Sequence, residues 1–268
     1  MSVVPTDAAS VILLRSGIAG DQALLIRRHT SLALFGGALV FPGGKLEPSD
    51  AGLIAAACRE TFEETGIVLA RQADGAPCAA PLAETLQPLR AEISRNARLF
   101  APLLAKNGLV IDPRGFIMWS HWITPSQVSR RFDTRFFVAR MPPGQIVRCD
   151  SAEATECLWL DLDTRDGLAD ESLALAPPTR FSLGDLTLSL RKHGNADRLM
   201  QMETNRPVAR VMPKMVRIDG HMMALMPWDP DYQAASGENT AEDVQFSAHY
   251  LGFPSRVPAP ANAGPAQR

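Results

Sequence analysis

Residues 43–67 read GGKLEPSDAGLIAAACRETFEETGI and carry the most informative pattern in this chain of 268 residues. Ser49 and Asp50 are good N-cap residues, and no proline follows them, so we expect a helix from Ala51 to Thr65 that ends at Gly66. Small or apolar side chains recur along it at helical spacing and predict a buried stripe made of Ile54, Ala57, Cys58 and Thr61.

Three glutamates share the face of this helix that lies opposite the stripe. Glu60, Glu63 and Glu64 stand at positions i, i+3 and i+4, so their carboxylates are neighbours and repel one another. A hard cation such as Mg²⁺ prefers carboxylate oxygens, so it could neutralise this cluster. It also keeps bound waters beside a phosphate substrate. Arg59 can also reach Glu63 or brace Glu60. An ordinary solvated acidic face is the alternative.

The glycine pair Gly43-Gly44 comes at the end of a short apolar run, at residues 36–41. Glycines at this place would let a phosphate approach the backbone closely. The segment is not a Walker loop, because Leu39 stands where the first glycine is needed and Leu46 replaces the Ser or Thr.

Taken together, these residues resemble the signature of the Nudix hydrolases, a spaced pattern of Gly, Glu, Arg-Glu, Glu-Glu and Gly. The matching residues are Gly44, Arg59, Glu60, Glu63, Glu64, Gly66 and Ile67. Asp50 stands where the first Glu is expected, eight residues rather than seven separate it from Arg59, and Thr61 occupies a usually apolar position. We therefore expect Asp50 to matter less than the helix glutamates and to act mainly as an N-cap.

The resemblance covers residues 8–165 and implies the Nudix fold, an α+β (α/β/α) architecture with a mixed β-sheet flanked by helices. It also implies a helical insertion after the signature, at residues 82–106. Residues 41–44 (FPGG) and the later Glu153, Glu156 and Trp159 fit the same pattern. The lengthened signature, the insertion and the segment 122–137 (WITPSQVSRRFDTRFF) look like the branch that includes the peroxisomal coenzyme A diphosphatases. The separate coenzyme A motif of some Nudix enzymes is not matched, because Ala33 stands at its arginine position.

Membership would imply a metal-dependent pyrophosphohydrolase that cleaves the phosphoanhydride of a nucleoside diphosphate linked to another group. Mg²⁺ or Mn²⁺ would bind to Glu60, Glu63 and Glu64, and Arg59 would orient a carboxylate. Such a metal polarises phosphoryl oxygens and lowers the pKa of bound water. The general base stays open between the glutamates of the signature and the later Glu153 and Glu156, whose alternative role is that of surface residues.

Candidate substrate-binding residues are Gly43, Gly44, Arg130, Arg131 and Arg135. Guanidinium groups suit phosphates, and the extra 3′-phosphate of coenzyme A would be one target. A solvated charged loop is the alternative for the arginines. Coenzyme A or acyl-coenzyme A leads as substrate, ahead of ADP-ribose, NADH, dinucleoside polyphosphates and capped RNA. A non-catalytic nucleotide sensor of the same fold is the second function.

The rest of the chain predicts further strands and helices. Strands are expected at 8–15 and 22–28 as a hairpin, and at 115–123, 134–140 and 155–162. Helices are expected over 82–106 with interruptions near Pro88 and Pro102, and at 168–176 and 180–190 with two prolines between them. Trp119 and Trp122, three apart, should face opposite sides of a strand, with both more suited to core packing than to stacking on a base. A late hairpin within 207–226 should turn at Asp219-Gly220.

This reading divides the chain into a core at residues 1–165, a C-terminal extension at 166–253 packed on the core, and a disordered tail at 254–268. The chain is 46% apolar with a net charge of −2, which excludes general disorder and a nucleic-acid-coating role. Its four cysteines form no CxxC pair, so a disulfide scaffold is not expected and a reducing compartment fits better. We expect a cytoplasmic protein with a nucleotide-type small-molecule substrate, no DNA and no membrane partner, and a homodimer stays open.

Overall fold

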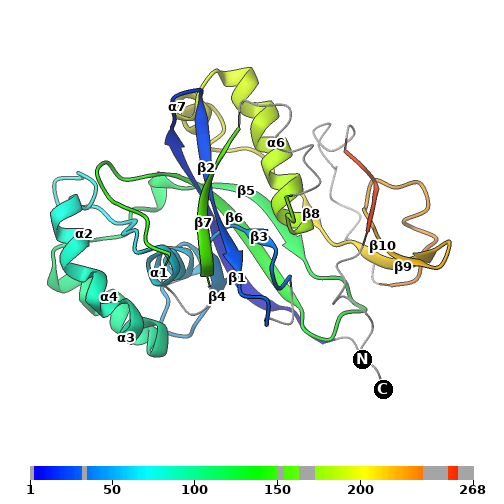
Figure 1. Cartoon of the computed structure of the whole chain (residues 1–268), viewed down its shortest axis with the longest axis horizontal. Helices are drawn as coiled ribbons and strands as arrows, with labels where there is room; N and C mark the ends of the chain where they lie inside the picture. The colour runs from blue at the N-terminus through cyan, green and yellow to red at the C-terminus, as the bar shows by residue number, and fades with distance from the viewer. Residues whose placement is uncertain (1–2, 32–34, 150–153, 163–172, 238–252, 259–268) are drawn as a thin grey trace.

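The computed structural model describes residues 3–31, 35–149, 154–162, 173–237 and 253–258. A mixed sheet with helices on both sides forms the centre of the molecule (Figure 1). Its strands run in the order β3-β2-β1-β6-β5-β8, with β4 beside β1 and β7 beside β2. The strands are β1 (Thr6–Ser16), β2 (Asp21–Arg28), β3 (Leu39–Val40), β4 (Gly43–Lys45), β5 (Ile117–Ile123), β6 (Phe132–Arg140), β7 (Ala154–Asp161) and β8 (Arg210–Val211).

The pairing confirms the predicted mixed sheet and the predicted first hairpin. β1 pairs antiparallel with β2, and it pairs in parallel with β6 along its other edge. β1 is a nearly continuous apolar run because side chains on both of its faces are covered. Ala9, Val11 and Leu13 pack on one face, and Ile12 and Leu14 pack on the other.

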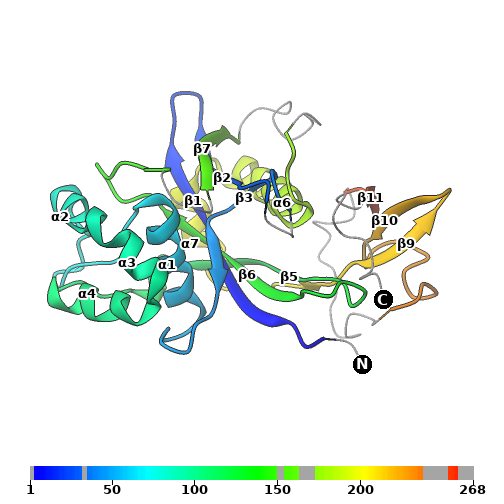
Figure 2. The same ribbon diagram turned by 60° about the horizontal axis from the view of Figure 1, so that its bottom comes forward.

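The first face is covered by α1 (Leu53–Thr65) and by the helical insertion. The insertion consists of α2 (Ala80–Leu86), η1 (Gln87–Leu89), α3 (Arg90–Arg95), η2 (Ala97–Leu99) and α4 (Phe100–Lys106), followed by η3 (Pro113–Gly115). Figures 1 and 2 show these helices together on one flank of the sheet. The predicted interruption near Pro88 is present as a 3₁₀ turn. Pro102 lies inside α4 and causes no break, and the chain leaves the helical conformation at Asn96 instead.

The opposite face is covered by α6 (Pro177–His193) and α7 (Ala196–Met202). Pro177 and Pro178 form the first turn of α6, where the missing N–H of proline costs little, so they do not separate two helices as predicted. Of the predicted helix 168–176, residues 168–172 lie outside the described residues. Residues 173–176 are described and are not helical, and Leu175 forms a parallel bridge with Leu39.

A small second sheet stands at the far end from the insertion (Figure 2). It is formed by β9 (Lys214–Ile218), β10 (His221–Leu225) and β11 (Arg256–Pro258). The predicted hairpin and its turn are confirmed, with positive φ values of 48° at Asp219 and 83° at Gly220. The prediction of a disordered tail from 254 is wrong for β11, which pairs with β10, while residues 259–268 lie outside the described residues.

A β-bulge in β5 changes the side on which one tryptophan lies. The pairing of β5 with β6 shifts between Met118 and Ser120, which inserts one extra residue into the strand. Trp119 and Trp122 consequently pack in the same core cluster, and the prediction that they face opposite sides is wrong. Their expected core packing is confirmed, since they are only 1% and 3% exposed.

Candidate active site

Helix α1 presents the charged residues of the site. It begins two residues later than predicted, at Leu53, and its N-cap is Gly52 with no side-chain cap. Neither Ser49 nor Asp50 caps the helix, so the predicted N-cap is wrong. The C-cap is confirmed: Gly66 has a left-handed φ of 75°, and its N–H donates to the carbonyl of Phe62 at 2.8 Å.

Arg59 lies at the centre of a buried network of carboxylates. Its side chain is 3% exposed, and its Nη1 donates to Glu60 Oε1 at 2.9 Å and to Glu63 Oε1 at 2.8 Å. Burial alone would lower the pKa of the guanidinium, but the bond to Asp50 and the charges of the two glutamates raise it above its usual value. The sequence offered contact with Glu63 or with Glu60 as alternatives, and Arg59 makes both.

Asp50 supplies the other half of this network. Both of its carboxylate oxygens accept from Arg59, and its Oδ2 also accepts from the backbone N–H of Glu47 at 2.9 Å. Its side chain is 4% exposed. Asp50 thus ties the loop before α1 to Arg59, which orients Glu60 and Glu63. We had expected Asp50 to act as an N-cap instead.

The glycine pair makes room for two of the glutamates. The backbone N–H of Gly43 donates to Glu64 Oε2 at 2.8 Å. A Cβ at Gly44 would stand 2.4 Å from the carboxylate carbon of Glu60, so only glycine allows this approach. The two glycines are therefore needed because carboxylates pack against β4. From the sequence we had expected them to make room for a phosphate.

A cavity of about 820 Å³ opens beside this network. Its wall includes Gly43, Gly44, Arg59, Glu60, Glu63 and Glu64, so the structure brings these predicted residues together. Cationic side chains also line it: Arg28, Lys45, Arg95, Arg98 and Arg130. The cavity therefore combines carboxylates that can hold a cation with guanidinium groups that can hold phosphates.

The three predicted arginines of the β5–β6 region differ in their surroundings. Arg130 is exposed, lines the cavity, and has its guanidinium carbon 5.6 Å from the centre of the Phe132 ring. Arg131 is 3% exposed, and its Nε and Nη1 donate to the carbonyls of Thr124 and Val3. Arg135 forms ion pairs with Asp7 and Asp133. Of the three, Arg130 alone is among the cavity-lining residues of the described part of the chain.

Arg28 is a cavity-lining residue that the sequence argument missed. Its Nε is buried and has no hydrogen-bond partner among the described residues. A buried donor of this kind is costly unless something pairs with it, and a phosphate oxygen would do so. No motif pointed to it, because a single arginine at the end of a strand is common.

The two later glutamates have different outcomes. Glu153 lies outside the described residues. Glu156, on β7, pairs with Arg27 at 2.7 Å, and its side chain is 51% exposed. Among the residues that the structure describes, it does not line the cavity beside α1.

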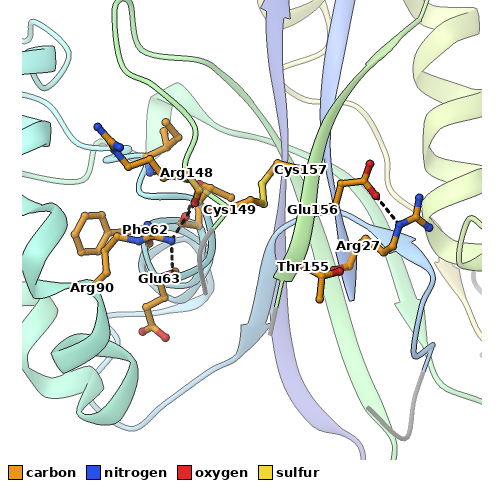
Figure 3. The surroundings of a disulfide bond; sticks show 12 residues. Arg27, Phe62, Glu63, Arg90, Arg148, Cys149, Thr155, Glu156 and Cys157 are labelled. Carbon is orange, nitrogen blue, oxygen red and sulfur yellow. Dashed lines mark hydrogen bonds and ion pairs between the residues drawn. A yellow bond between two sulfur atoms is a disulfide. The ribbon is translucent and has the colours of Figure 1, made fainter. Parts of the chain in front are cut away.

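A disulfide joins Cys149 to Cys157 close to the end of α1, which we did not predict (Figure 3). The buried Arg90 joins the end of α1 to the residue before Cys149, because it donates to the carbonyls of Phe62, Glu63 and Arg148. The backbone N–H of Arg148 in turn donates to the carbonyl of Thr65 at 2.8 Å. The disulfide thus ties β7 to the segment that braces the end of the glutamate helix.

The carboxylates fit a metal that shares its ligands with water and substrate. Within the described ranges, no three His, Cys, Asp or Glu side chains are arranged as a group that could hold a metal ion. Glu60, Glu63 and Glu64 nevertheless line one cavity and offer only oxygen donors. Mg²⁺ is commonly held in this way, by one or two carboxylates, waters and substrate phosphates.

Among the residues that the structure describes, no helix is both long and apolar enough to cross a membrane.

The comparisons with known proteins agree with this geometry. The sequence model of the NUDT19 Nudix domain matches residues 48–186. An acyl-coenzyme A diphosphatase NUDT19 from Xenopus laevis is 29% identical over 53% of this chain and 41% of its own length. The human protein of the same name is 30% identical over 51% of this chain and 39% of its own length. This chain therefore spans about two fifths of these relatives.

A solved structure shows the same fold. A crystal structure of a NUDIX hydrolase from Alicyclobacillus acidocaldarius aligns with a TM-score of 0.62 and 24% identity. The alignment covers 76% of this chain and 99% of that one. The matched domain, the carboxylate helix and the shared fold together show that this chain belongs to the Nudix family, in the branch of the NUDT19 Nudix domain.

Proposed function

We propose that this protein is a metal-dependent pyrophosphohydrolase whose substrate is coenzyme A or acyl-coenzyme A. The observation that carries the proposal is that Glu60, Glu63 and Glu64 line the same cavity as several arginines. Coenzyme A has a diphosphate that would lie at the glutamates and a further phosphate that would pair with a guanidinium group. The names of the NUDT19 relatives support this choice of substrate.

In this proposal the reaction adds water across one phosphoanhydride. The water oxygen bonds to one phosphorus and the bridging P–O bond breaks. Two phosphomonoesters are released, with two protons when both are fully ionised. A bound Mg²⁺ or Mn²⁺ would neutralise the phosphate charge and lower the pKa of the attacking water. Glu60, Glu63 and Glu64 would hold it, and a glutamate of α1 or Glu153 would take the proton.

The chain's own network keeps these groups in place before substrate arrives. Arg59 fixes the orientation of Glu60 and Glu63, and the Gly43 N–H fixes Glu64. Arg28 and Arg130 would pair with phosphate oxygens of the substrate. These pairs would hold the charged substrate at the cavity wall. Such preorganised charges matter most where charge develops during the reaction. A cytoplasmic location belongs to the same proposal.

A hydrolysis panel tests the proposal. Coenzyme A, an acyl-coenzyme A, NADH, ADP-ribose, a dinucleoside tetraphosphate and capped RNA are incubated with the full chain and Mg²⁺ or Mn²⁺. We expect metal-dependent release of phosphomonoesters, fastest from the coenzyme A compounds. Nucleotide binding without hydrolysis of any member, with either metal, would replace the enzyme by the nucleotide sensor. Preference for another member would leave the hydrolase and change its substrate.

A further inference from the structure

The helical insertion contacts the glutamate helix α1 at its C-terminal end. Arg90, the first residue of α3, is buried, and its Nε donates to the carbonyl of Phe62 at 3.1 Å. Its Nη2 donates to the carbonyls of Glu63 at 3.0 Å and of Arg148 at 3.1 Å (Figure 3). One side chain of the insertion therefore joins the last turn of α1 to the segment that follows β6.

Apolar packing brings the insertion against this turn. Phe62 belongs to one core cluster with Leu86, Ile93 and Phe100 of the insertion. Its ring stacks on that of Phe100, with 5.9 Å between the ring centroids. Apolar burial is non-directional, so it holds the two parts together without fixing where the turn lies. The hydrogen bonds of Arg90 supply that direction.

The end of α1 depends on donors from outside the helix. The last four carbonyls of an α-helix have no partner within it. Arg90 pairs with two of them, on Phe62 and Glu63, and the backbone N–H of Arg148 pairs with a third, on Thr65. α1 is described over its whole length, and its last turn contains no basic residue. The guanidinium group of Arg90 thus supplies a cation where the peptide dipoles place partial negative charge.

Two of the three glutamates of the site belong to this last turn. Glu63 lines the cavity while its own carbonyl accepts from Arg90, and Glu64 is the next residue. On the cavity side, Arg59 holds the carboxylate of Glu63 and the Gly43 N–H holds that of Glu64. Helix ends fray, so without Arg90 the backbone of both glutamates could move while these side-chain contacts pull on it.

We propose that Arg90 is a positioning residue for the glutamate site, through which the helical insertion supports catalysis. Among the residues that the structure describes, Arg90 is not part of the cavity wall, so it acts through the backbone of Glu63. The inference rests on the proposed function and adds a residue outside the cavity to it. A displacement on the order of 1 Å can lower turnover about 100-fold, so a shift of this turn would be visible in the rate.

Two substitutions separate positioning from a loss of stability. Arg90→Met keeps an unbranched apolar side chain and removes all donors, whereas Arg90→Lys keeps the charge and part of the donors. Arg206→Met is the matched control. The Arg206 side chain is also 7% exposed, it pairs with Asp185 at 2.7 Å, and it is absent from the described cavity wall.

Each variant is measured well below its melting temperature in two ways. Hydrolysis of coenzyme A with Mg²⁺ gives kcat and KM, and electron paramagnetic resonance of free Mn²⁺ gives the metal affinity of the full chain without substrate. We expect Arg90→Met to lower kcat and the Mn²⁺ affinity by about 10-fold each, the lower end for residues that support metal ligands. KM should stay unchanged, because Arg90 does not contact the substrate. Arg90→Lys should lie between, and Arg206→Met should lower only the melting temperature.

Three results would overturn the inference. They are a kcat and a Mn²⁺ affinity like those of the wild type in every Arg90 variant that folds, an equal loss of both in Arg206→Met, and a change in KM alone. If Arg90→Met does not fold, Arg90→Lys is compared with the control in the same way. If the wild type hydrolyses no substrate but Mn²⁺ binding follows the expected pattern, the positioning role stands and the proposed enzyme is rejected.

Discussion

Arg59 holds both carboxylate oxygens of Asp50, with Nε to Oδ1 at 3.0 Å and Nη2 to Oδ2 at 2.9 Å. Both side chains are almost fully buried. The pair joins the loop before α1 to the arginine that orients Glu60 and Glu63. Asp50, a residue that departs from the family signature, is thus part of the support of the carboxylates.

We predict that Asp50→Asn lowers the free energy of unfolding by about 3 kcal/mol. Loss of one partner leaves a buried charge poorly compensated, which costs more than the roughly 1 kcal/mol of a lost N-cap. Urea denaturation measures the change, with Ser49→Ala as the control at the neighbouring position. A loss of 1 kcal/mol or less in Asp50→Asn would mean that Glu60 and Glu63 compensate Arg59 alone.

Glu63→Gln and Glu64→Gln should each lower turnover by at least about 100-fold in a protein that remains folded. The substitution keeps the shape and removes the charge that metal binding and phosphate neutralisation require. Glu92→Gln, exposed on α3 and away from the cavity wall, is the control. Turnover close to that of the wild type in both variants at saturating Mg²⁺ would show that the site is assigned to the wrong residues.

Gly44→Ala and Gly43→Ala should have different effects. A Cβ at Gly44 meets the end of the Glu60 side chain, which can move, so we expect roughly 10-fold slower turnover with the fold retained. A Cβ at Gly43 meets the backbone carbonyl of Ala9 at 2.4 Å, and the φ of 155° is unfavourable for alanine. That variant should be strongly destabilised. Thermal melting and steady-state kinetics distinguish the two, and equal loss of stability would contradict this account.

The Cys149–Cys157 disulfide should stabilise the oxidised protein by about 2 to 3 kcal/mol, the loop-closure value for a short loop. Cys149→Ser should lose that amount in oxidising buffer and match the reduced wild type in reducing buffer. Cys58 and Cys78 are buried and unpaired with each other, so they provide no substitute bridge. Disulfides are rare in the cytosol. Identical stabilities in both buffers would favour the reducing compartment that the cysteine content predicts.

The pH dependence of stability should contain a contribution from Asp229. Hydrogen bonds from Arg256 and Ser255 outweigh its burial and lower the pKa of this carboxyl to about 2. The folded state therefore favours the charged form: the stabilisation is complete above about pH 4 and is lost as the pH falls through 2. Asp229→Asn should cost about 1 to 2 kcal/mol at pH 7, a value reduced for the partial exposure of Arg256.

Urea denaturation of Asp229→Asn and the wild type at several pH values measures this contribution. The difference between the two should shrink between pH 4 and pH 2. A constant difference over that range would show that the effect of the substitution is not electrostatic. Because Arg256 begins β11, limited proteolysis after residue 253 should also become faster in the variant.

The sequence alone determined the glutamate helix, its C-cap and the mixed sheet. These follow from local rules: three carboxylates at helical spacing share a face, a glycine ends the helix, and apolar runs bounded by turn residues give strands. The family resemblance rested on the same residues. Local spacing also identified the Asp219-Gly220 turn, because that dipeptide accepts the positive φ values of a tight hairpin.

The tertiary structure alone decided which charged residues meet. Arg131 and Arg135 lie in the same short segment as Arg130 and carry the same guanidinium group. Arg131 donates to the carbonyl of Val3, and Arg135 forms an ion pair with Asp7, both far away in sequence. Arg130 lines the cavity. The bulge at Met118–Ser120 moved Trp119 to the side of Trp122, against the two-residue period of a strand. Asp50 meets Arg59 nine residues further along, and Cys149 meets Cys157 eight residues further along, each across two different elements. Arg28 reaches the cavity only in the folded chain. No helical or strand period encodes these contacts.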